Sequence, residues 1–469
     1  ASSLLDAVHA DRRADEQAGR PWPVWDGELY LELHRGTLTT QAELKRLNRL
    51  CETTLRAAEM LCAAEDDTAA HTELHALWRR LLVLQFHDIL PGSSIREVNE
   101  QAEAEYRSVL AAAEHIRDER LGPEHRPTTS TGTLTVFNAA SEPASGIVDT
   151  QGDLVFVRDV PACAIHEAQP EQPDAVVLRG TTIENDLIRA EIDRDGRLAS
   201  LVLLATGRDV CAAGSPAHRL RLYEDRPHMW DAWDIDPDYE LTERPIEPAV
   251  GVVSHQDSPL RAAITASFRI GNASSAEVRY TLDAASPCLV IDTRIDWRES
   301  HRLLRVDYPT SVRSQHATFE VQGGVTERPT HRNTPWDRAR FEVPVQRWMD
   351  LSEHGAGLAV LNTSKYGASC WGSTFGLSLL RAPTHPDPQA DRGAHSIRTA
   401  LLPHAGDRHA SRVSHHAELL NTPLRAATAS PRRLVPEFEI VGGSARCELT
   451  AFKRGTRRPD RRIARFVET

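Results

Sequence analysis

An imidazole and a carboxylate stand side by side at His87 and Asp88, directly before a proline-glycine pair. A neutral imidazole nitrogen and a carboxylate oxygen both suit zinc, and a catalytic zinc site keeps positions open for substrate. The structural alternative is a histidine at the C-terminal end of a helix, where a cation interacts favourably with the helix dipole. Most single histidines have structural roles, so the pair alone favours that alternative.

The elements that position this pair are predicted to be helices. Apolar residues recur at three- and four-residue steps from Leu44 to Leu61, which predicts an amphipathic helix. A second helix is predicted from about Thr68, which can cap it, to Phe86. The proline-glycine pair then breaks the helical pattern. His87 is therefore expected at the end of this second helix.

A third helix is predicted to begin with Ser93 or Ser94 as its cap and to present apolar side chains as far as Ile116. Three helices with short connections predict a compact bundle. A polar stretch rich in Pro, Gly and Thr follows, from Leu121 to Gly132. We therefore expect a helical domain over residues 1–122.

Beyond this stretch the apolar period changes from helical to alternating, which predicts strands. Short strands are predicted at 133–138, 188–193 and 289–294, and Asp195-Gly196 predicts a hairpin turn. Strand and turn signals continue to the end of the chain, so residues 123–469 are predicted to form one or two β sub-domains. The fold class is α+β: an N-terminal three-helix bundle followed by a large antiparallel β-sandwich region.

Composition and charge exclude several classes of function. The chain has 469 residues, too many for one hydrophobic core, and its net charge of −12 without a basic block argues against a nucleic-acid partner. No apolar run approaches the roughly 18 residues of a membrane-spanning helix. The seven cysteines are scattered, which is typical of a reducing compartment, and we expect a cytoplasmic protein. Lysine is rare among the 55 basic residues, which we interpret as the codon composition of a GC-rich bacterial genome.

Short motifs along nearly the whole chain form a collinear series. They are Val24–Thr37, Leu77–Ile95, Tyr223–Pro227 with Asp231–Asp236, Glu327–Thr334, Lys365–Gly367, Leu379–Pro383 and Leu420–Leu424. In composition and order they resemble the motifs of bacterial and cytosolic α-mannosidases of glycoside hydrolase family 38. One such match would be weak, whereas six or more in the same order are specific.

The resemblance implies a retaining exo-α-mannosidase with one zinc ion as cofactor. In this family an N-terminal α/β domain holds the zinc through a His-x-Asp pair and an aspartate. A histidine of the helical middle domain completes the ligand set, and it matches His87. Retention of configuration requires one carboxylate as nucleophile and a second as acid/base, roughly 5 Å apart. The substrate-binding positions that the resemblance implies are Asp88, His34, Arg35, Trp233 and Asp234.

The family's first zinc motif is not recognisable in this chain. Three His-x-Asp matches, at His9, His255 and His385, lack its apolar-strand context, and we interpret them as accidental. The helical pattern is already running at Leu4, so we expect a larger parent whose N-terminal catalytic domain carries the nucleophile. One imidazole and one carboxylate cannot build a site of three or four ligands. We therefore expect no catalytic residue here, zinc only together with the missing N-terminal domain, and an inactive isolated chain.

Two other hypotheses stay open. The chain could be a non-catalytic carbohydrate-binding module or a scaffold that only positions domains. In the first case Trp230, Trp233, Trp336 and Trp348 could stack on sugar faces, although buried core positions explain Trp336 and Trp348 better. The expected partners are a mannose-containing oligosaccharide and the missing N-terminal catalytic domain. A homo-oligomer stays open, and neither nucleic acid nor a membrane is expected.

Overall fold

The computed structural model describes residues 3–25, 27–30, 33–65, 67–122, 132–436, 447–456 and 460–468. The chain divides into two compact units, residues 1–31 and residues 32–469. The first unit contains helix α1 (Ser3–Gln17), and behind it Arg20 and Trp22 both donate hydrogen bonds to the Asp15 carboxylate. The second unit contains every other element named below.

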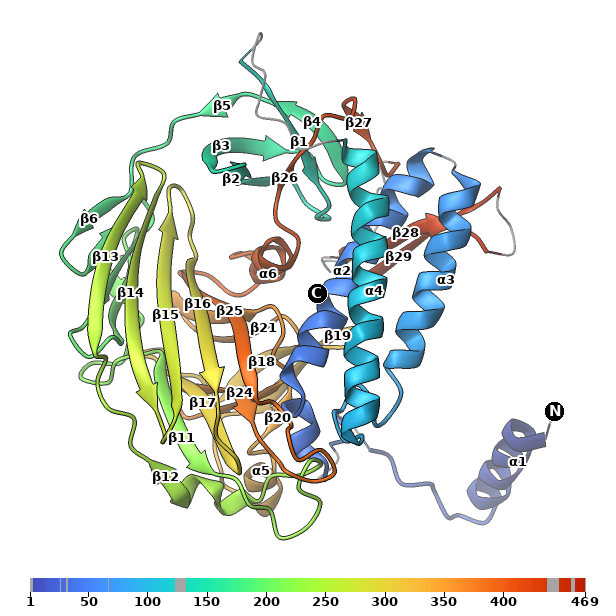
Figure 1. Cartoon of the computed structure of the whole chain (residues 1–469). Helices are drawn as coiled ribbons and strands as arrows, with labels where there is room; N and C mark the ends of the chain where they lie inside the picture. Colours follow the sequence, from blue (N-terminus) through green and yellow to red (C-terminus); the bar gives the residue numbers. More distant parts are fainter. Residues whose placement is uncertain are drawn as a thin grey trace. The chain divides into compact units, whose positions relative to one another are not determined.

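Three long helices of the second unit form the predicted bundle (Figure 1). They are α2 (Ala42–Glu65), α3 (Thr68–Leu84) and α4 (Arg96–Leu121). Each turns an apolar stripe toward the other two, and Leu55, Leu74 and Tyr106 are fully buried between them. Burial of an aliphatic side chain of this size contributes about 1.5–3 kcal/mol, so the shared core holds the bundle together.

The limits of α3 differ from the prediction. The residue that caps its N-terminus is Asp67, whose carboxylate accepts the N–H of Ala70 at 3.0 Å, and not Thr68. An aspartate binds orphan N–H groups and the positive end of the helix dipole together, which makes it the better cap. The helix ends at Leu84, two residues before the predicted Phe86.

The predicted serine cap of α4 is wrong. Ile95 occupies the N-cap position and makes no side-chain cap. The Ser93 hydroxyl donates instead to the Asp88 carboxylate at 2.7 Å, and the Ser94 hydroxyl donates to the Asp88 carbonyl at 2.8 Å. A hydrogen bond to an ionised carboxylate is stronger than one from a backbone N–H to a neutral hydroxyl, which accounts for Ser93. Both serines therefore hold the preceding turn rather than the helix.

The β region supplies the predicted strands, and the strand pairs are antiparallel. The three strand predictions correspond to β1 (Leu134–Asn138), β8 (Ile188–Ile192) and β16 (Leu289–Trp297). The Asp195-Gly196 turn joins β8 to β9 (Leu198–Leu203), as predicted.

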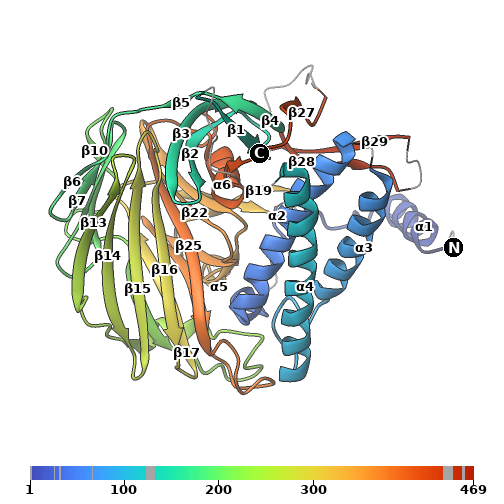
Figure 2. The same cartoon turned by 45° about the horizontal axis from the view of Figure 1, so that its top comes forward.

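Two large sheets pack against each other. The first has nine strands, in the order β13 (Gly251–Ser258), β14 (Arg261–Ile270), β15 (Ser274–Asp283), β16, β25 (Gly393–His404), β22 (Ala356–Asn362), β21 (Trp348–Glu353), β18 (His316–Val321) and β19 (Gly324–Pro329). Strands of this larger sheet, from β13 to β25, run side by side in Figure 2. The second has six, in the order β12 (Glu243–Arg244), β11 (Arg219–Glu224), β17 (Arg302–Pro309), β24 (Thr374–Arg381), β23 (Gly367–Trp371) and β20 (Val343–Pro344). The Tyr308 hydroxyl of β17 reaches Thr399 of β25 at 3.3 Å across the interface. The predicted α+β fold with a β-sandwich is confirmed.

Smaller sheets surround this sandwich. They are β10 (Arg208–Asp209) with β9, β8, β7 (Thr182–Glu184) and β6 (Val177–Arg179); β26 (Arg425–Ala426) with β1, β4 (Ala164–Ala168) and β27 (Arg432–Arg433); β2 (Ala144–Thr150) with β3 (Asp153–Val160) and β5 (Pro170–Glu171); and β28 (Cys447–Arg454) with β29 (Arg462–Glu468). The remaining short helices are η1 (Arg35–Leu38), η2 (Pro237–Thr242), α5 (Pro335–Ala339) and α6 (Val413–Asn421).

The bundle and the β region share a core. Leu449 and Phe452 of β28 lie in one buried cluster with Met60 and Leu61 of α2. Where one domain ends and the next begins stays a prediction, and residues 123–131 at the expected boundary lie outside the described residues. Within the described part of the chain, no helix has the length and apolar character needed to cross a membrane.

Candidate functional site

His87 and Asp88 lie in a series of turns directly after α3. The His87 side chain is 74% exposed, and its Nε2 atom lies 3.4 Å from Oδ2 of Asp88, whose side chain is 42% exposed. The imidazole also stacks near Phe86, with ring centroids 4.2 Å apart. A histidine packed inside the bundle could not bind a metal shared with another element. His87 is instead at the surface beside a carboxylate, as a ligand role requires.

The turn that carries this pair packs against the segment after η1. Gly92 has a left-handed backbone (φ +83), and a Cβ atom there would lie 2.5 Å from the Thr40 carbonyl oxygen. A side chain at this position would therefore be strained by the backbone and would also clash with Thr40. The glycine lets the His87–Asp88 turn approach the start of α2 closely.

Arg35 and Asp234 form a second part of the site. The Arg35 N–H donates to Oδ1 of Asp234 at 3.1 Å, and the guanidinium Nη1 lies 3.8 Å from the same oxygen. The guanidinium also donates to the Ala339 carbonyl at 3.1 Å and covers the Phe341 ring, 4.5 Å from its centre. Both charged side chains are largely buried and satisfy each other, so this pair orders the two segments that it joins.

His34 and Trp233 flank this ion pair. His34 has a left-handed backbone (φ 64) and an exposed side chain, and its carbonyl oxygen accepts the Thr37 hydroxyl at 2.5 Å. The Thr37 N–H donates to the Trp233 carbonyl at 3.2 Å, which joins η1 to the loop before Asp234. The structure thus brings together four of the residues singled out in the sequence, namely His34, Arg35, Trp233 and Asp234.

Arg381 is the centre of this cluster, and its side chain is fully buried. Its five hydrogen bonds run to the Asp225 carboxylate (2.7 Å), the Thr40 hydroxyl (3.2 Å) and the carbonyls of Ala232 (3.1 Å), Asp231 (2.8 Å) and Asp234 (2.8 Å). Burial raises the pKa of Asp225, and the Arg381 guanidinium opposes that rise. A Cβ atom on Gly36 would lie 1.9 Å from Nη1 of Arg381, so only glycine leaves room for the guanidinium.

Several residues that build the site received no role from the sequence. Arg381 and Asp225 stand inside motifs that carry the family resemblance, which is the signal that could have found them. Asp391 gave no signal, although its carboxylate accepts the N–H groups of Gln41 (2.8 Å) and Ala42 (2.6 Å) and so caps α2 from about 350 residues away in sequence.

The His87–Asp88 pair fits part of a zinc site but not a whole one. Imidazole nitrogen and carboxylate oxygen are suitable zinc ligands, and both groups reach the same exposed surface. Among the described residues there is no group of three or more His, Cys, Asp or Glu side chains that could hold a metal ion. Asp26, Leu31 and Glu32 of the first motif lie outside the described residues.

The tryptophans divide into two groups. Trp348 is fully buried in the core, as predicted. The same prediction for Trp336 is wrong, because that side chain is 72% exposed. Trp336 lies in the short helix α5, whose capping box turns Asp337 inward and leaves the tryptophan on the outside. Trp230 is 61% exposed and packs edge to face against Trp233, with ring centroids 6.1 Å apart.

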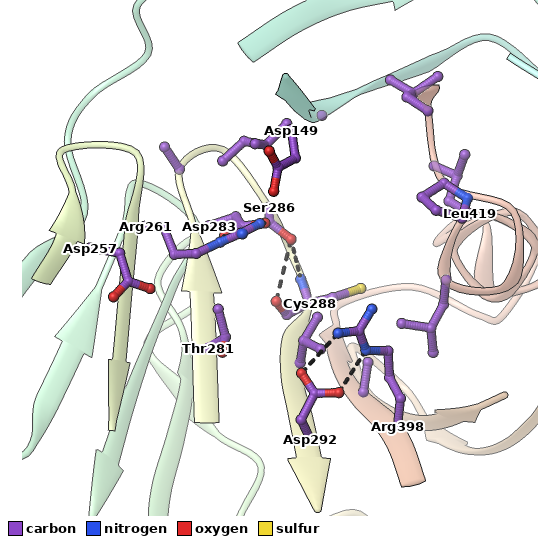
Figure 3. Close-up of a pocket in the computed structure, with 18 of the residues that line it drawn as sticks. Asp149, Asp257, Arg261, Thr281, Asp283, Ser286, Cys288, Asp292, Arg398 and Leu419 are labelled. Carbon is purple, nitrogen blue, oxygen red and sulfur yellow. Dashed lines mark hydrogen bonds and ion pairs between the residues drawn. The ribbon is translucent and has the colours of Figure 1, made fainter. Parts of the chain in front are cut away.

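A groove of about 870 Å³ lies elsewhere, between the nine-stranded sheet, the β2–β3 hairpin and α6 (Figure 3). Its charged groups pair with each other: Arg261 makes two hydrogen bonds with Asp283, and Arg398 makes two with Asp292. No Trp, Tyr or Phe is found among the described residues that line it, so it lacks an aromatic platform for a sugar ring. The imidazole of His87 and the carboxylate of Asp88 are suitable zinc ligands, whereas the Arg–Asp pairs of the groove satisfy each other. The surface around His87 is therefore the better candidate site, despite the volume of the groove.

Comparison with known proteins decides the family. The α-mannosidase middle domain matches residues 32–122, and the C-terminal domain of glycosyl hydrolase family 38 matches residues 183–389. Together these matches cover more than half of the chain.

The chain belongs to glycosyl hydrolase family 38.

Its curated relatives are α-mannosidases. Human alpha-mannosidase 2C1 is 38% identical over 463 residues, which is 94% of this chain and 44% of that protein. An alpha-mannosidase of Saccharomyces cerevisiae is 30% identical over 437 residues, which is 86% of this chain and 38% of that protein. This family 38 chain therefore spans less than half the length of these relatives.

A solved structure shares the fold. The crystal structure of an alpha-mannosidase from Enterococcus faecalis superposes with a TM-score of 0.74 over 92% of this chain and 62% of that chain, at 14% sequence identity. A family 38 protein from the same organism gives a TM-score of 0.75 over 98% of this chain. The arrangement of bundle and sandwich is therefore that of family 38 proteins.

Proposed function

We propose that this chain is the middle and C-terminal part of a zinc-dependent retaining exo-α-mannosidase, which hydrolyses terminal α-mannosides of oligosaccharides. The observation that supports this most directly is the exposed His87–Asp88 pair at the end of the bundle of a family 38 chain. His87 would supply one zinc ligand, and the other ligands and the nucleophilic carboxylate would come from an N-terminal catalytic domain. Zinc, when bound, supplies a Lewis-acidic centre that binds oxygen atoms of the substrate.

The residues of this chain would bind and orient the sugar. The carboxylate of Asp88 accepts hydrogen bonds, so it can receive a sugar hydroxyl next to the metal position. The exposed imidazole of His34 and the edge of Trp233 offer a polar and an apolar contact on the neighbouring segments. The buried Arg35–Asp234 pair keeps these segments in place. No acid/base or nucleophilic role falls on this chain.

The surface around His87 is suited to a second domain. Leu82, Val83 and Phe86 are 60%, 66% and 59% exposed, and all three lie within five residues of His87. Contiguous exposed apolar side chains mark an interaction surface. A catalytic domain that covered this patch would place its own ligands next to the imidazole and would exclude water from the site. The scattered cysteines support a reducing, cytoplasmic compartment for the whole enzyme.

Reconstitution tests this function. The chain is mixed with a polypeptide that carries an N-terminal domain of family 38, and hydrolysis of an aryl α-mannoside is measured. Neither part is expected to be active alone, because each lacks ligands of the zinc site. Together they are expected to bind one zinc and release the aryl alcohol with retention of configuration.

The matched variants are His87→Ala and His75→Ala. His75 is also exposed and lies on α3, twelve residues earlier. Changes to residues that only support a zinc ligand lower activity roughly 10–100-fold, so His87→Ala, which removes the ligand itself, should lower it by more than that. The activity of His75→Ala should stay within about twofold of the wild type. Full activity of the His87→Ala assembly would refute the ligand role. An assembly that binds mannan but hydrolyses nothing would favour the carbohydrate-binding module instead.

A further inference from the structure

Lys45 is a buried cation that joins the two parts of the site. It lies in the first turn of α2 and is 4% exposed. Its ammonium group donates to three backbone carbonyls, those of Thr40 (2.5 Å), Leu90 (2.9 Å) and Pro91 (3.2 Å). Leu90 and Pro91 belong to the turn that carries His87 and Asp88.

The carbonyl of Thr40 belongs to a residue that contacts the other part of the site, the Arg35–Asp234 cluster. The Thr40 hydroxyl lies 2.9 Å from the carbonyls of both Gly36 and Ala232, which share its single hydrogen, and it accepts a hydrogen bond from the Arg381 guanidinium. Thr40 is therefore fixed to the segments that carry Arg35 and Asp234. One ammonium group thus ties the His87–Asp88 turn to the Arg35–Asp234 cluster.

Burial of a lysine at this position lowers the stability of the fold unless nearby contacts offset the cost. Burial, helped by the nearby cations Lys365 and Arg381 and opposed by the charge of Asp391, lowers the pKa of Lys45 to about 7. A cation in the first turn of a helix also opposes the helix dipole. What compensates for these costs is the set of three carbonyls, because all three N–H groups of the ammonium find an acceptor.

Lysine and arginine are not equivalent at this position. Arginine is the commoner basic residue of this chain, and Lys45 is one of its three lysines. A tetrahedral ammonium spreads its three donors around one atom, whereas a guanidinium holds its donors in one plane on a larger group. The three carbonyls around Lys45 therefore suit an ammonium group better than a guanidinium.

We propose that Lys45 is a positioning residue, which fixes the His87–Asp88 turn relative to the Arg35–Asp234 cluster so that both face one metal and one sugar. This inference rests on the proposed function for its consequence in catalysis. Its structural part, the restraint of the turn, stands on the contacts of this chain.

Hydrogen–deuterium exchange of the chain tests the restraint. Lys45→Met and Lys45→Arg both remove the three-way donor, and amides of residues 88–94 should exchange at least about tenfold faster, since their local opening is no longer opposed. Lys365→Met is the matched control for the loss of a buried lysine near Asp391, because Lys365 donates to the Leu379 carbonyl and not to the carbonyls of this turn. Unchanged exchange in residues 88–94, or an equal rise across α3 and α4, would overturn the restraint.

Zinc affinity of the reconstituted assembly tests the consequence. Chelator competition should show at least about tenfold weaker zinc binding for Lys45→Met and Lys45→Arg, as for other changes that disorient a ligand, and no change for Lys365→Met. Equal zinc affinity in wild type and Lys45→Met would overturn the positioning role. If the wild-type assembly bound no zinc, the proposed function would fall, and the exchange result would still decide whether Lys45 holds the turn.

Discussion

Replacement of Arg381 by methionine should destabilise the chain far more than the loss of an ordinary ion pair. The guanidinium is fully buried and makes five hydrogen bonds, and its partner Asp225 is 1% exposed. Removal of one member of a buried pair leaves an uncompensated charge and costs about 3–5 kcal/mol. The carbonyls of Asp231 and Asp234 also lose the Arg381 donor, at about 1–3 kcal/mol for each group that stays buried and unpaired, whereas the Ala232 carbonyl keeps the Thr40 hydroxyl. The total expected loss exceeds about 4 kcal/mol.

Urea unfolding of Arg381→Met, of Asp225→Leu with Arg381→Met, and of Arg398→Met measures this loss. The double variant removes the stranded carboxylate and should recover about 1–4 kcal/mol relative to Arg381→Met alone. Arg398 makes two hydrogen bonds with Asp292, one more than Arg381 makes with Asp225, but its side chain is 52% exposed, so its loss should cost less than about 1 kcal/mol. Equal stability losses for Arg381→Met and Arg398→Met would refute the reasoning, as would a double variant no more stable than the single one.

Two further perturbations test neighbouring parts of the structure. Gly36→Ala places a methyl group 1.9 Å from the Arg381 guanidinium and should lower the free energy of unfolding by about 1–3 kcal/mol. Gly146→Ala is the control, because a methyl group there meets open space and should change the free energy of unfolding little. Equal midpoints of urea unfolding for the two variants would contradict the packing argument. Burial raises the pKa of Glu59 to about 7 from 4.5, so the folded state keeps a proton that the unfolded state releases between these values. The stability of the wild type therefore falls as pH rises from 4.5 to 7. Glu59→Gln should be as stable as the wild type at pH 4 and more stable by at most about 3 kcal/mol at pH 8. Thermal melts in which the difference between the two proteins does not change with pH would contradict this prediction.

The periodicity of the chain predicted the elements well, because helices and strands follow from local patterns. The apolar steps from Leu44 to Leu61 correspond to α2, and the alternating run at Leu289 corresponds to β16. Capping was predicted less well. Ser93 and Ser94 are good caps by type, but the Asp88 carboxylate takes the hydroxyl of Ser93 and the Asp88 carbonyl takes that of Ser94, and this competition is visible only in space.

The candidate site was predicted only where a resemblance named its residues. His87 and Asp234 came from motifs, whereas the side chains that hold them in place act across long separations in sequence. Arg381 reaches Thr40 over 341 residues, which no local pattern reports. Lys45 received no role from the sequence, because two of the carbonyls that it binds, those of Leu90 and Pro91, lie about 45 residues away. Trp336 was assigned to the core by residue type, and the short helix α5 turned it outward.

The position of zinc relative to His87 in the assembled enzyme tests the central claim most directly. A crystal of this chain together with a family 38 N-terminal domain, measured at the zinc absorption edge, locates the metal without assumptions about activity. Anomalous density about 2.0–2.1 Å from an imidazole nitrogen of His87 is the predicted result. Zinc bound elsewhere in the assembly, with the His87 ring turned toward solvent, would contradict it.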